Sequence, residues 1–111
     1  MQNRRAYATR AFAAYFAREA AGRSRSMQDT AQQLRDYTAC EAALCALRAE
    51  QRDAVRAIYT VRNNTAHKIA GAVCRYALTK AHADPSTVYR WLQIARALFF
   101  ACREQPPPKT K

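Results

Sequence analysis

The stretch 84-DPSTVYRWLQIARALFF-100 joins a strong helix start to a long apolar run. Asp84 supplies a carboxylate for the free N–H groups of a first helical turn, and Pro85 suits the first helical position because it has no N–H to satisfy. Apolar residues then recur three and four positions apart, which is the period of one side of an α-helix. They are Val88, Trp91, Leu92, Ala95, Leu98, Phe99 and Cys102. The stretch therefore predicts a helix over 85–103 that buries one side in a core.

The opposite side of this helix is polar in its first turns. It presents Ser86, Thr87, Arg90 and Gln93. An arginine fork matches the edge of guanine, and a glutamine amide matches the edge of adenine. In helix-turn-helix proteins the first turns of the second helix reach the base edges. We therefore predict these four residues as contacts to DNA bases; an ordinary solvated face of a bundle helix is the alternative.

The rest of the chain also has a composition typical of helices. Its 111 residues include only two glycines, and no proline precedes Pro85. A chain rich in alanine and arginine and poor in glycine favours helix at most positions. We expect an all-α fold of about five helices, the last two forming a helix-turn-helix. The expected organisation is N-terminal helices over 1–48, a helix-turn-helix region over 49–103 and a Pro/Lys tail over 104–111.

Local signals set the expected helix boundaries. The first helix should cover 3–23 and end at Gly22, and Ser26 should cap a second helix with Asp29 in its first turn. A third helix is expected over 49–61, with no glycine or proline to show whether it is separate from the second. A fourth is expected over 66–78, followed by a short connection over 79–83.

Periodicity also predicts which side chains of the first four helices face inward. The predicted inward residues are Tyr7, Phe12, Tyr15, Phe16, Ala20, Leu34, Tyr37, Cys40 or Glu41, Leu44, Leu47, Val55, Ile58, Tyr59, Arg52 as a further candidate, Ile69, Ala70, Val73, Ala77 and Leu78. Gly71 lies inside the fourth helix, where glycine is unfavourable. The close approach of another helix would explain it.

Charge is the strongest global signal. The net charge is +11, with +5 over residues 1–25, −2 over 26–53 and +8 over 54–111. A basic domain of this kind indicates a polyanionic partner, most often nucleic acid, and the acidic middle indicates a scaffold. Candidate contacts to the DNA backbone lie before and within the last helix. They are Thr65, Lys68, Arg75, Lys80, His82 and Tyr89.

The segments 86-STVYRWLQIARALFFACR-103 and 50-EQRDAVRAIY-59 resemble phage-encoded transcriptional regulators of the RinA/ArpU type. The C-terminal helix-turn-helix of that family is similar to region 4 of sigma-70 factors. The resemblance implies promoter-DNA binding and control of phage or prophage genes, with 87-TVYRW-91 at the start of the recognition helix. Here the serine directly precedes the threonine, and the connection from Tyr59 to Ser86 is longer than in the family pattern.

The residues offer little support for catalysis or for a cofactor. Cys40, Cys45, Cys74 and Cys102 form no CxxC pair, and neither His67 nor His82 has ligand spacing to them. We expect small buried or half-buried thiols, no metal, no cofactor and no enzymatic activity. The absence of a long apolar run predicts an intracellular protein that is not associated with membranes. The resemblance to phage regulators implies the cytoplasm of a bacterial host and association with the nucleoid.

Two other functions remain open at the level of sequence. One is a helical adaptor that docks on an acidic partner such as RNA polymerase, and the other is an RNA-binding protein that uses the arginine-rich N-terminal helix. Phe100 and Ile94 fall off the main apolar side of 85–103. They are the best support for the adaptor; the alternative is that they pack on the N-terminal helices or form the seam of a homodimer.

Overall fold

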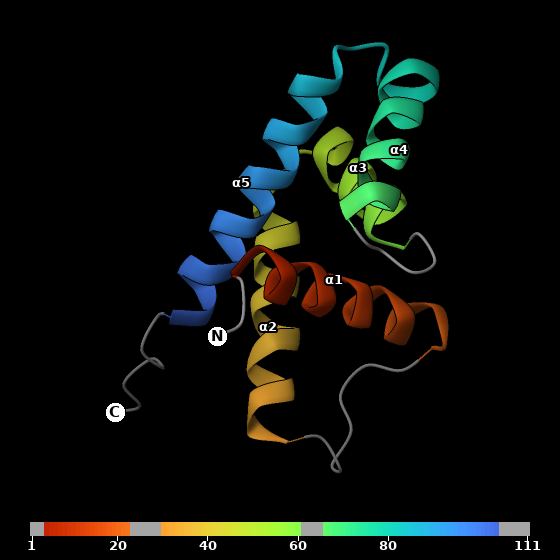
Figure 1. The fold of residues 1–111 in the computed structure, drawn as a ribbon. Helices are drawn as coiled ribbons and strands as arrows, with labels where there is room; N and C mark the ends of the chain where they lie inside the picture. Colours follow the sequence, from red (N-terminus) through yellow and green to blue (C-terminus); the bar gives the residue numbers. More distant parts are fainter. Residues whose placement is uncertain (1–3, 23–29, 61–65, 105–111) are drawn as a thin grey trace.

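Five α-helices and no strand make up the part of the chain that the computed structural model describes, residues 4–22, 30–60 and 66–104 (Figure 1). The all-α prediction is confirmed. The helices are α1 (Arg4–Ala20), α2 (Ala31–Ala46), α3 (Ala49–Tyr59), α4 (Ala66–Tyr76) and α5 (Pro85–Glu104). A π-helical turn, η1 (Ala77–Ala81), extends α4.

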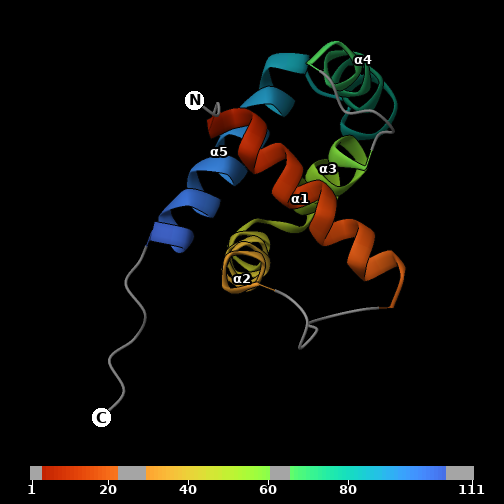
Figure 2. The same cartoon turned by 60° about the horizontal axis from the view of Figure 1, so that its bottom comes forward.

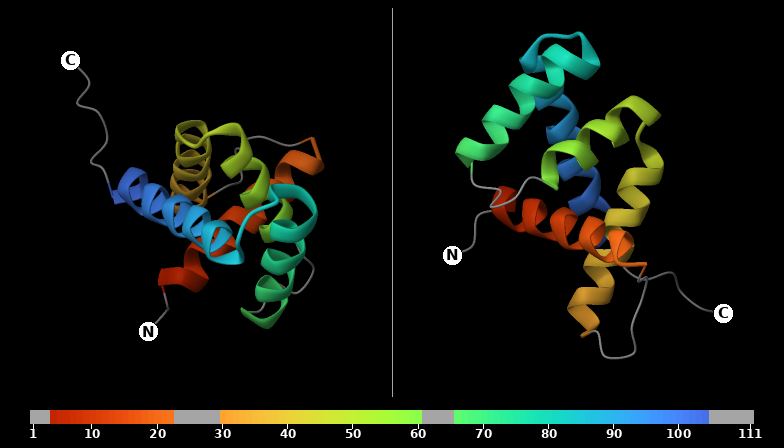
Figure 3. Two further views of the ribbon diagram at one scale, coloured as in Figure 1. Left: turned by 90° about the horizontal axis from the view of Figure 1, so that it is seen from above. Right: turned by 90° about the vertical axis from the view of Figure 1, so that its right-hand side faces the viewer.

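α5 is the longest helix, with 20 residues, and is the helix on which the others assemble. It lies along α2 and also contacts α1, α3, α4 and η1. α1 crosses α2 at a steep angle, which is clearest in Figure 2, where α2 is seen end-on. The start of α5 and the end of α4 meet at one end of the molecule, away from the start of α2 (Figure 3).

One hydrophobic core unites all five helices. At its centre the ring of Phe12 in α1 lies 5.7 Å from Tyr59 of α3 and 5.7 Å from Phe99 of α5, measured between ring centroids. All three side chains are buried. Segments 1–48 and 49–103 therefore share one core, and the expected division between them is not a break in packing.

Two of the predicted boundaries can be compared directly with the structure. Gly22 has φ +74°, a left-handed conformation that suits glycine after a helix C-terminus, as expected. α2 begins at Ala31 and is capped by Thr30, so a helix start at Ser26 was wrong. The Thr30 hydroxyl accepts the Gln33 N–H at 3.1 Å, and the Gln33 side chain accepts the Thr30 N–H at 2.8 Å. Ser26 and Asp29 lie outside the described residues.

α2 and α3 are separate helices although no glycine or proline divides them. Leu47 and Arg48 are extended, with ψ of 153° and 159°. The side chain of Gln51 accepts the Arg48 N–H at 3.0 Å, and Arg52 donates to the carbonyls of Leu44 and Leu47 at 3.1 and 3.2 Å. Side chains of α3 thus satisfy backbone groups that the break would otherwise leave unpaired.

The inward side of α4 agrees with the prediction except at its end. Val73 and Ala77 are buried as expected, Ala72 and Tyr76 are buried as well, and Leu78 is 77% exposed. The cause is Tyr76, whose ring packs inward while its hydroxyl donates to Asp53 of α3 at 2.5 Å. The expected close approach of a helix at Gly71 is also wrong, since an added Cβ would meet only the Arg75 guanidinium, at 3.7 Å.

Exposure also corrects three inward predictions in the other helices. Ala20, Glu41 and Arg52 are exposed. Cys40, the alternative to Glu41, is fully buried, and burial raises the pKa of its thiol, with the charge of Asp36 adding to the effect. Position 40 therefore belongs to the core side of α2.

Candidate nucleic-acid interface

α5 begins where the sequence predicts, with Asp84 as its cap. The carboxylate of Asp84 accepts the backbone N–H of Ser86 at 2.9 Å and the Ser86 hydroxyl at 2.7 Å. These two bonds, the backbone one first, hold the pKa of the Asp84 carboxyl below its usual value. The Asp84 carbonyl accepts the N–H of Thr87 at 2.9 Å. The first turn of α5 is therefore fixed without help from other helices.

Three of the four predicted base contacts share the outer face of α5. Ser86, Arg90 and Gln93 are exposed, whereas Thr87 is half-buried at the edge of that face. The difference follows from helix geometry, because consecutive residues point about 100° apart. Among the described residues, the side chains of Arg90 and Gln93 have no hydrogen-bond or ion-pair partner. Their donors and acceptors are available to water or to another molecule.

The predicted backbone contacts fall into three groups. Lys68, Arg75, Lys80 and His82 are exposed. Tyr89 is half-buried and packs against the core, so it is less accessible than the others. Thr65 lies outside the described residues. The prediction is therefore sharpest for the four exposed side chains of α4, η1 and the connection that follows.

The connection between η1 and α5 is only residues 82–84 long. Helical structure continues to Ala81, so a connection over 79–83 was too early. His82 is left-handed, with φ 50° and ψ 46°, and its N–H donates to the Ala77 carbonyl. Glycine is the usual residue in such a position because a Cβ is strained there. The chain thus turns sharply from η1 into the capped start of α5.

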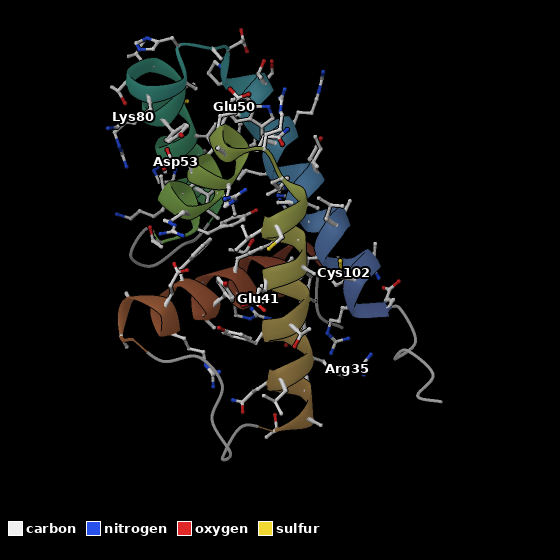
Figure 4. All side chains as sticks on the ribbon, turned by 180° about the vertical axis from the view of Figure 1, so that it is seen from behind. Arg35, Glu41, Glu50, Asp53, Lys80 and Cys102 are labelled. Carbon is white, nitrogen blue, oxygen red and sulfur yellow. The ribbon has the colours of Figure 1, made fainter. Side chains whose placement is uncertain are left out.

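Positive charge dominates these last two helices. Asp84 is the single acid between residues 66 and 103. The Lys and Arg side chains of the same range are Lys68, Arg75, Lys80, Arg90, Arg96 and Arg103. Glu41, Glu50 and Asp53 belong to α2 and α3, whereas Lys80 belongs to η1 (Figure 4). Acidic residues are therefore scarce on the elements that carry the predicted DNA contacts, whereas basic residues occur on all five helices.

The two apolar residues that fall off the core side of α5 have different environments. Phe100 packs on α1, where the Arg4 guanidinium lies 4.0 Å from its ring centroid and the Tyr7 ring 6.3 Å. Ile94 is 37% exposed. The first alternative for Phe100, packing on the N-terminal helices, is thus confirmed. Leu78 is an exposed apolar residue that the periodicity did not reveal.

Cysteines and acids do not gather into a metal site in the described ranges. No group of three or more His, Cys, Asp or Glu side chains there could hold a metal ion. Cys45 and Cys74 are exposed free thiols, contrary to the expectation that all four cysteines would be at least half-buried. Among the helices of the same residues, none has the length and apolar character needed to span a bilayer.

Comparison with known proteins adds no relative. The chain matches no family model, no curated protein and no solved structure.

Proposed function

We propose that this chain is a sequence-specific DNA-binding transcriptional regulator that reads the major groove with α5. The observation that carries the proposal is the exposed, unpartnered pair Arg90 and Gln93, in the first turns of a capped helix. The end of α4, which is basic, lies beside this helix start. A short connection between two helices, followed by a polar leading face, is the arrangement by which helix-turn-helix proteins present base-reading side chains.

Each side chain of the outer face has a chemically suitable target. The fork of Arg90 suits the O6 and N7 acceptors of guanine, and the amide of Gln93 suits the N6 donor and N7 acceptor of adenine. The Ser86 hydroxyl already donates to Asp84. Ser86 would therefore act as an acceptor, for example from the amino group of cytosine. Thr87 would contact the wall of the groove from the edge of the face.

Contacts to phosphate would come from α4, η1 and the connection. Lys68, Arg75, Lys80 and His82 are exposed on these elements. They would set the position of the domain on the duplex without reading its sequence. The resemblance to regulators of the RinA/ArpU type supports promoter DNA, and phage or prophage genes, as the target of this binding.

Selection of bound duplexes from a random pool, followed by titration of the selected site, tests the proposal. Arg90→Ala should weaken that site by about 1–3 kcal/mol and relax the preference at one base pair. Arg56→Ala is the matched control, because Arg56 pairs with Glu19 on the α1–α3 side of the molecule. Equal binding by both variants, or no selected sequence at all, would contradict the assignment.

Salt dependence tests the backbone contacts separately. Lys80→Ala should weaken selected and random duplexes alike. It should also reduce the slope of log K against log salt by about 0.9 for the lost phosphate contact. Lys68→Ala should behave in the same way. An unchanged slope in both variants would remove α4 and η1 from the interface.

A helical adaptor remains the second candidate, because Leu78 and Ile94 expose apolar surface on η1 and α5. Such residues can anchor an interface with another protein, for instance an acidic surface of RNA polymerase. Gel shifts with duplex DNA, single strands and RNA at two salt concentrations separate the functions. Failure to bind duplex DNA would favour the adaptor or the RNA-binding alternative.

A further inference from the structure

A hollow of about 310 Å³ lies between α1 and α2, away from the start of α5. It exists because the two helices cross steeply and because α1 presents the small residues Ala11 and Ala14 at the crossing. Ligand pockets in proteins begin at roughly 300 Å³, so the hollow has room for one small molecule. Its walls combine aromatic, cationic and amide groups.

Two tyrosines supply an aromatic wall. The rings of Tyr15 and Tyr37 lie 4.9 Å apart between centroids, inclined at 40°. Burial, with the nearby charges of Tyr37, Glu41 and Glu19 adding to it, raises the pKa of Tyr15 to about 12, so its hydroxyl stays neutral. Planar rings stack favourably on such side chains.

Two arginines of α1 make the hollow cationic. Arg10 and Arg18 both line it, and they are separated by about 12 Å along the helix axis. Arg10 is exposed and has no partner among the described residues, and the Arg18 guanidinium lies 5.6 Å from the Tyr37 ring centroid. Asp36 also lines the hollow, but its carboxylate accepts a hydrogen bond from the Arg103 guanidinium at 2.5 Å, so its charge is paired. The lining itself therefore has a net positive charge, with Glu19 and Glu41 nearby but outside it.

Two glutamines of α2 leave complementary groups unused. Gln32 donates its amide to the Tyr7 hydroxyl at 2.9 Å, and Gln33 uses its carbonyl to accept the Thr30 N–H. In the described part of the chain, one side-chain carbonyl and one side-chain NH₂ are thus left without a partner. A free acceptor and a free donor, on consecutive residues of α2, are the groups with which the N6 and N7 edge of adenine pairs.

We propose that this hollow binds a nucleotide. The base stacks against Tyr37 and Tyr15 with its polar edge towards Gln32 and Gln33, and the phosphate is held by Arg10 and Arg18. Stacking on aromatic side chains combined with nearby cations is the chemistry by which proteins hold nucleotide units without a dedicated loop. The site is separate from the outer face of α5 and does not depend on the DNA-binding proposal.

Titration of the ¹⁵N-labelled full chain with AMP, adenosine and inorganic phosphate tests this proposal. AMP should bind with a Kd of about 1 mM or tighter and shift amide signals of α1 and α2. Adenosine can make only the base contacts and inorganic phosphate only the arginine contacts, so each should bind at least about tenfold more weakly than AMP. Absence of saturable AMP binding, or shifts confined to α4 and α5, would overturn the proposal.

Variants identify the site among the charged surfaces of this basic protein. Ala14→Leu should abolish AMP binding by filling the hollow, and Arg10→Gln should weaken it by about tenfold through loss of one charged contact. Both positions are exposed or half-exposed on α1, so the fold should persist, as a circular dichroism spectrum would show. Arg48→Gln removes the same charge from the exposed N-cap of α3, outside both proposed sites, and should leave AMP binding unchanged. Equal loss in Arg48→Gln and Arg10→Gln would show a general charge effect and overturn the assignment.

Discussion

The two ends of α5 belong to one helix but treat their polar side chains in opposite ways. At the C-terminal end Arg103 donates to Asp36 of α2, and Glu104 pairs with Arg4 of α1 at 3.0 Å. At the N-terminal end the Asp84 and Ser86 side chains bond only within the first turn, and Arg90 has no partner among the described residues. The polar side chains of the C-terminal end bond to α1 and α2, and those of the N-terminal end face solvent.

Along this single helix, the polar side chains that bond to other helices are thus separate from those that are open to solvent. Residues of the C-terminal end contribute to the free energy of unfolding through contacts with α1 and α2. Residues of the N-terminal outer face contribute little to it, because water satisfies them in the folded and the unfolded chain alike. Substitutions can therefore test the two roles independently, beginning with the core on which both ends depend.

The largest expected difference in unfolding free energy is between alanine substitutions at two leucines. Leu92→Ala should lower the free energy of unfolding by about 2–5 kcal/mol, because Leu92 is 1% exposed and its truncation leaves a cavity. Leu78→Ala, on the exposed surface of η1, should change it by less than about 0.5 kcal/mol. Denaturant unfolding followed by circular dichroism measures both. A large loss in Leu78→Ala would mean that this end of the molecule is packed against something in solution.

A second contrast uses two arginines of α5. Arg103→Gln should cost about 1.5–3 kcal/mol, because its side chain is only 20% exposed and hydrogen-bonds the charged Asp36. Arg90→Gln should leave the free energy of unfolding nearly unchanged. Denaturant unfolding measures both variants. Comparable losses of unfolding free energy would contradict the proposed difference between the two ends of α5.

A third prediction concerns strain at the connection. His82→Gly should raise the free energy of unfolding by about 1 kcal/mol, because glycine adopts a left-handed backbone without the penalty of a Cβ. His67→Gly, at an exposed position in the helical backbone of α4, should instead lower it by roughly a few tenths of a kcal/mol. Thermal unfolding compares them. Destabilisation by His82→Gly would show that the histidine side chain makes a stabilising contact.

The smallest effect is a pH dependence at the start of α5. The folded-state pKa of Asp84 lies below its ordinary value of 3.8, so its charged cap contributes fully above that value. The contribution is lost as the pH falls through the lower folded pKa. Asp84→Asn keeps a capping side chain that does not titrate. The difference in stability between the two proteins should therefore shrink in acid, and a constant difference down to low pH would contradict the proposed cap.

Much of the fold could be predicted because its signals are local. Gly22 and the pair Asp84 and Pro85 mark helix ends through backbone geometry that needs no distant partner. The break between α2 and α3 depends instead on Gln51, which accepts the N–H of Arg48, and on Arg52, which reaches back to carbonyls at the end of α2. Nothing in the residues near Arg48 could show this break before the helices were placed.

The candidate site also has features that local sequence predicts and features that depend on contacts between helices. The outward position of Arg90 and Gln93 follows from helical period and from the apolar residues that must face inward. The exposure of Leu78 does not, because it results from Tyr76 turning inward to reach Asp53. The hollow between α1 and α2 depends on the crossing of two helices, and no spacing within either helix encodes that crossing.

The π turn over Ala77–Ala81 has a consequence for how this end of the chain can change over time. A π turn behaves as an α-helix that has accepted one additional residue. Deleting one residue here would let α4 continue as a regular helix and keep the direction of the chain that follows. Many substitutions in the turn would also be tolerated, because several of its residues are exposed. The segment between Tyr76 and Asp84 is therefore a place where the chain can lose one residue at low cost.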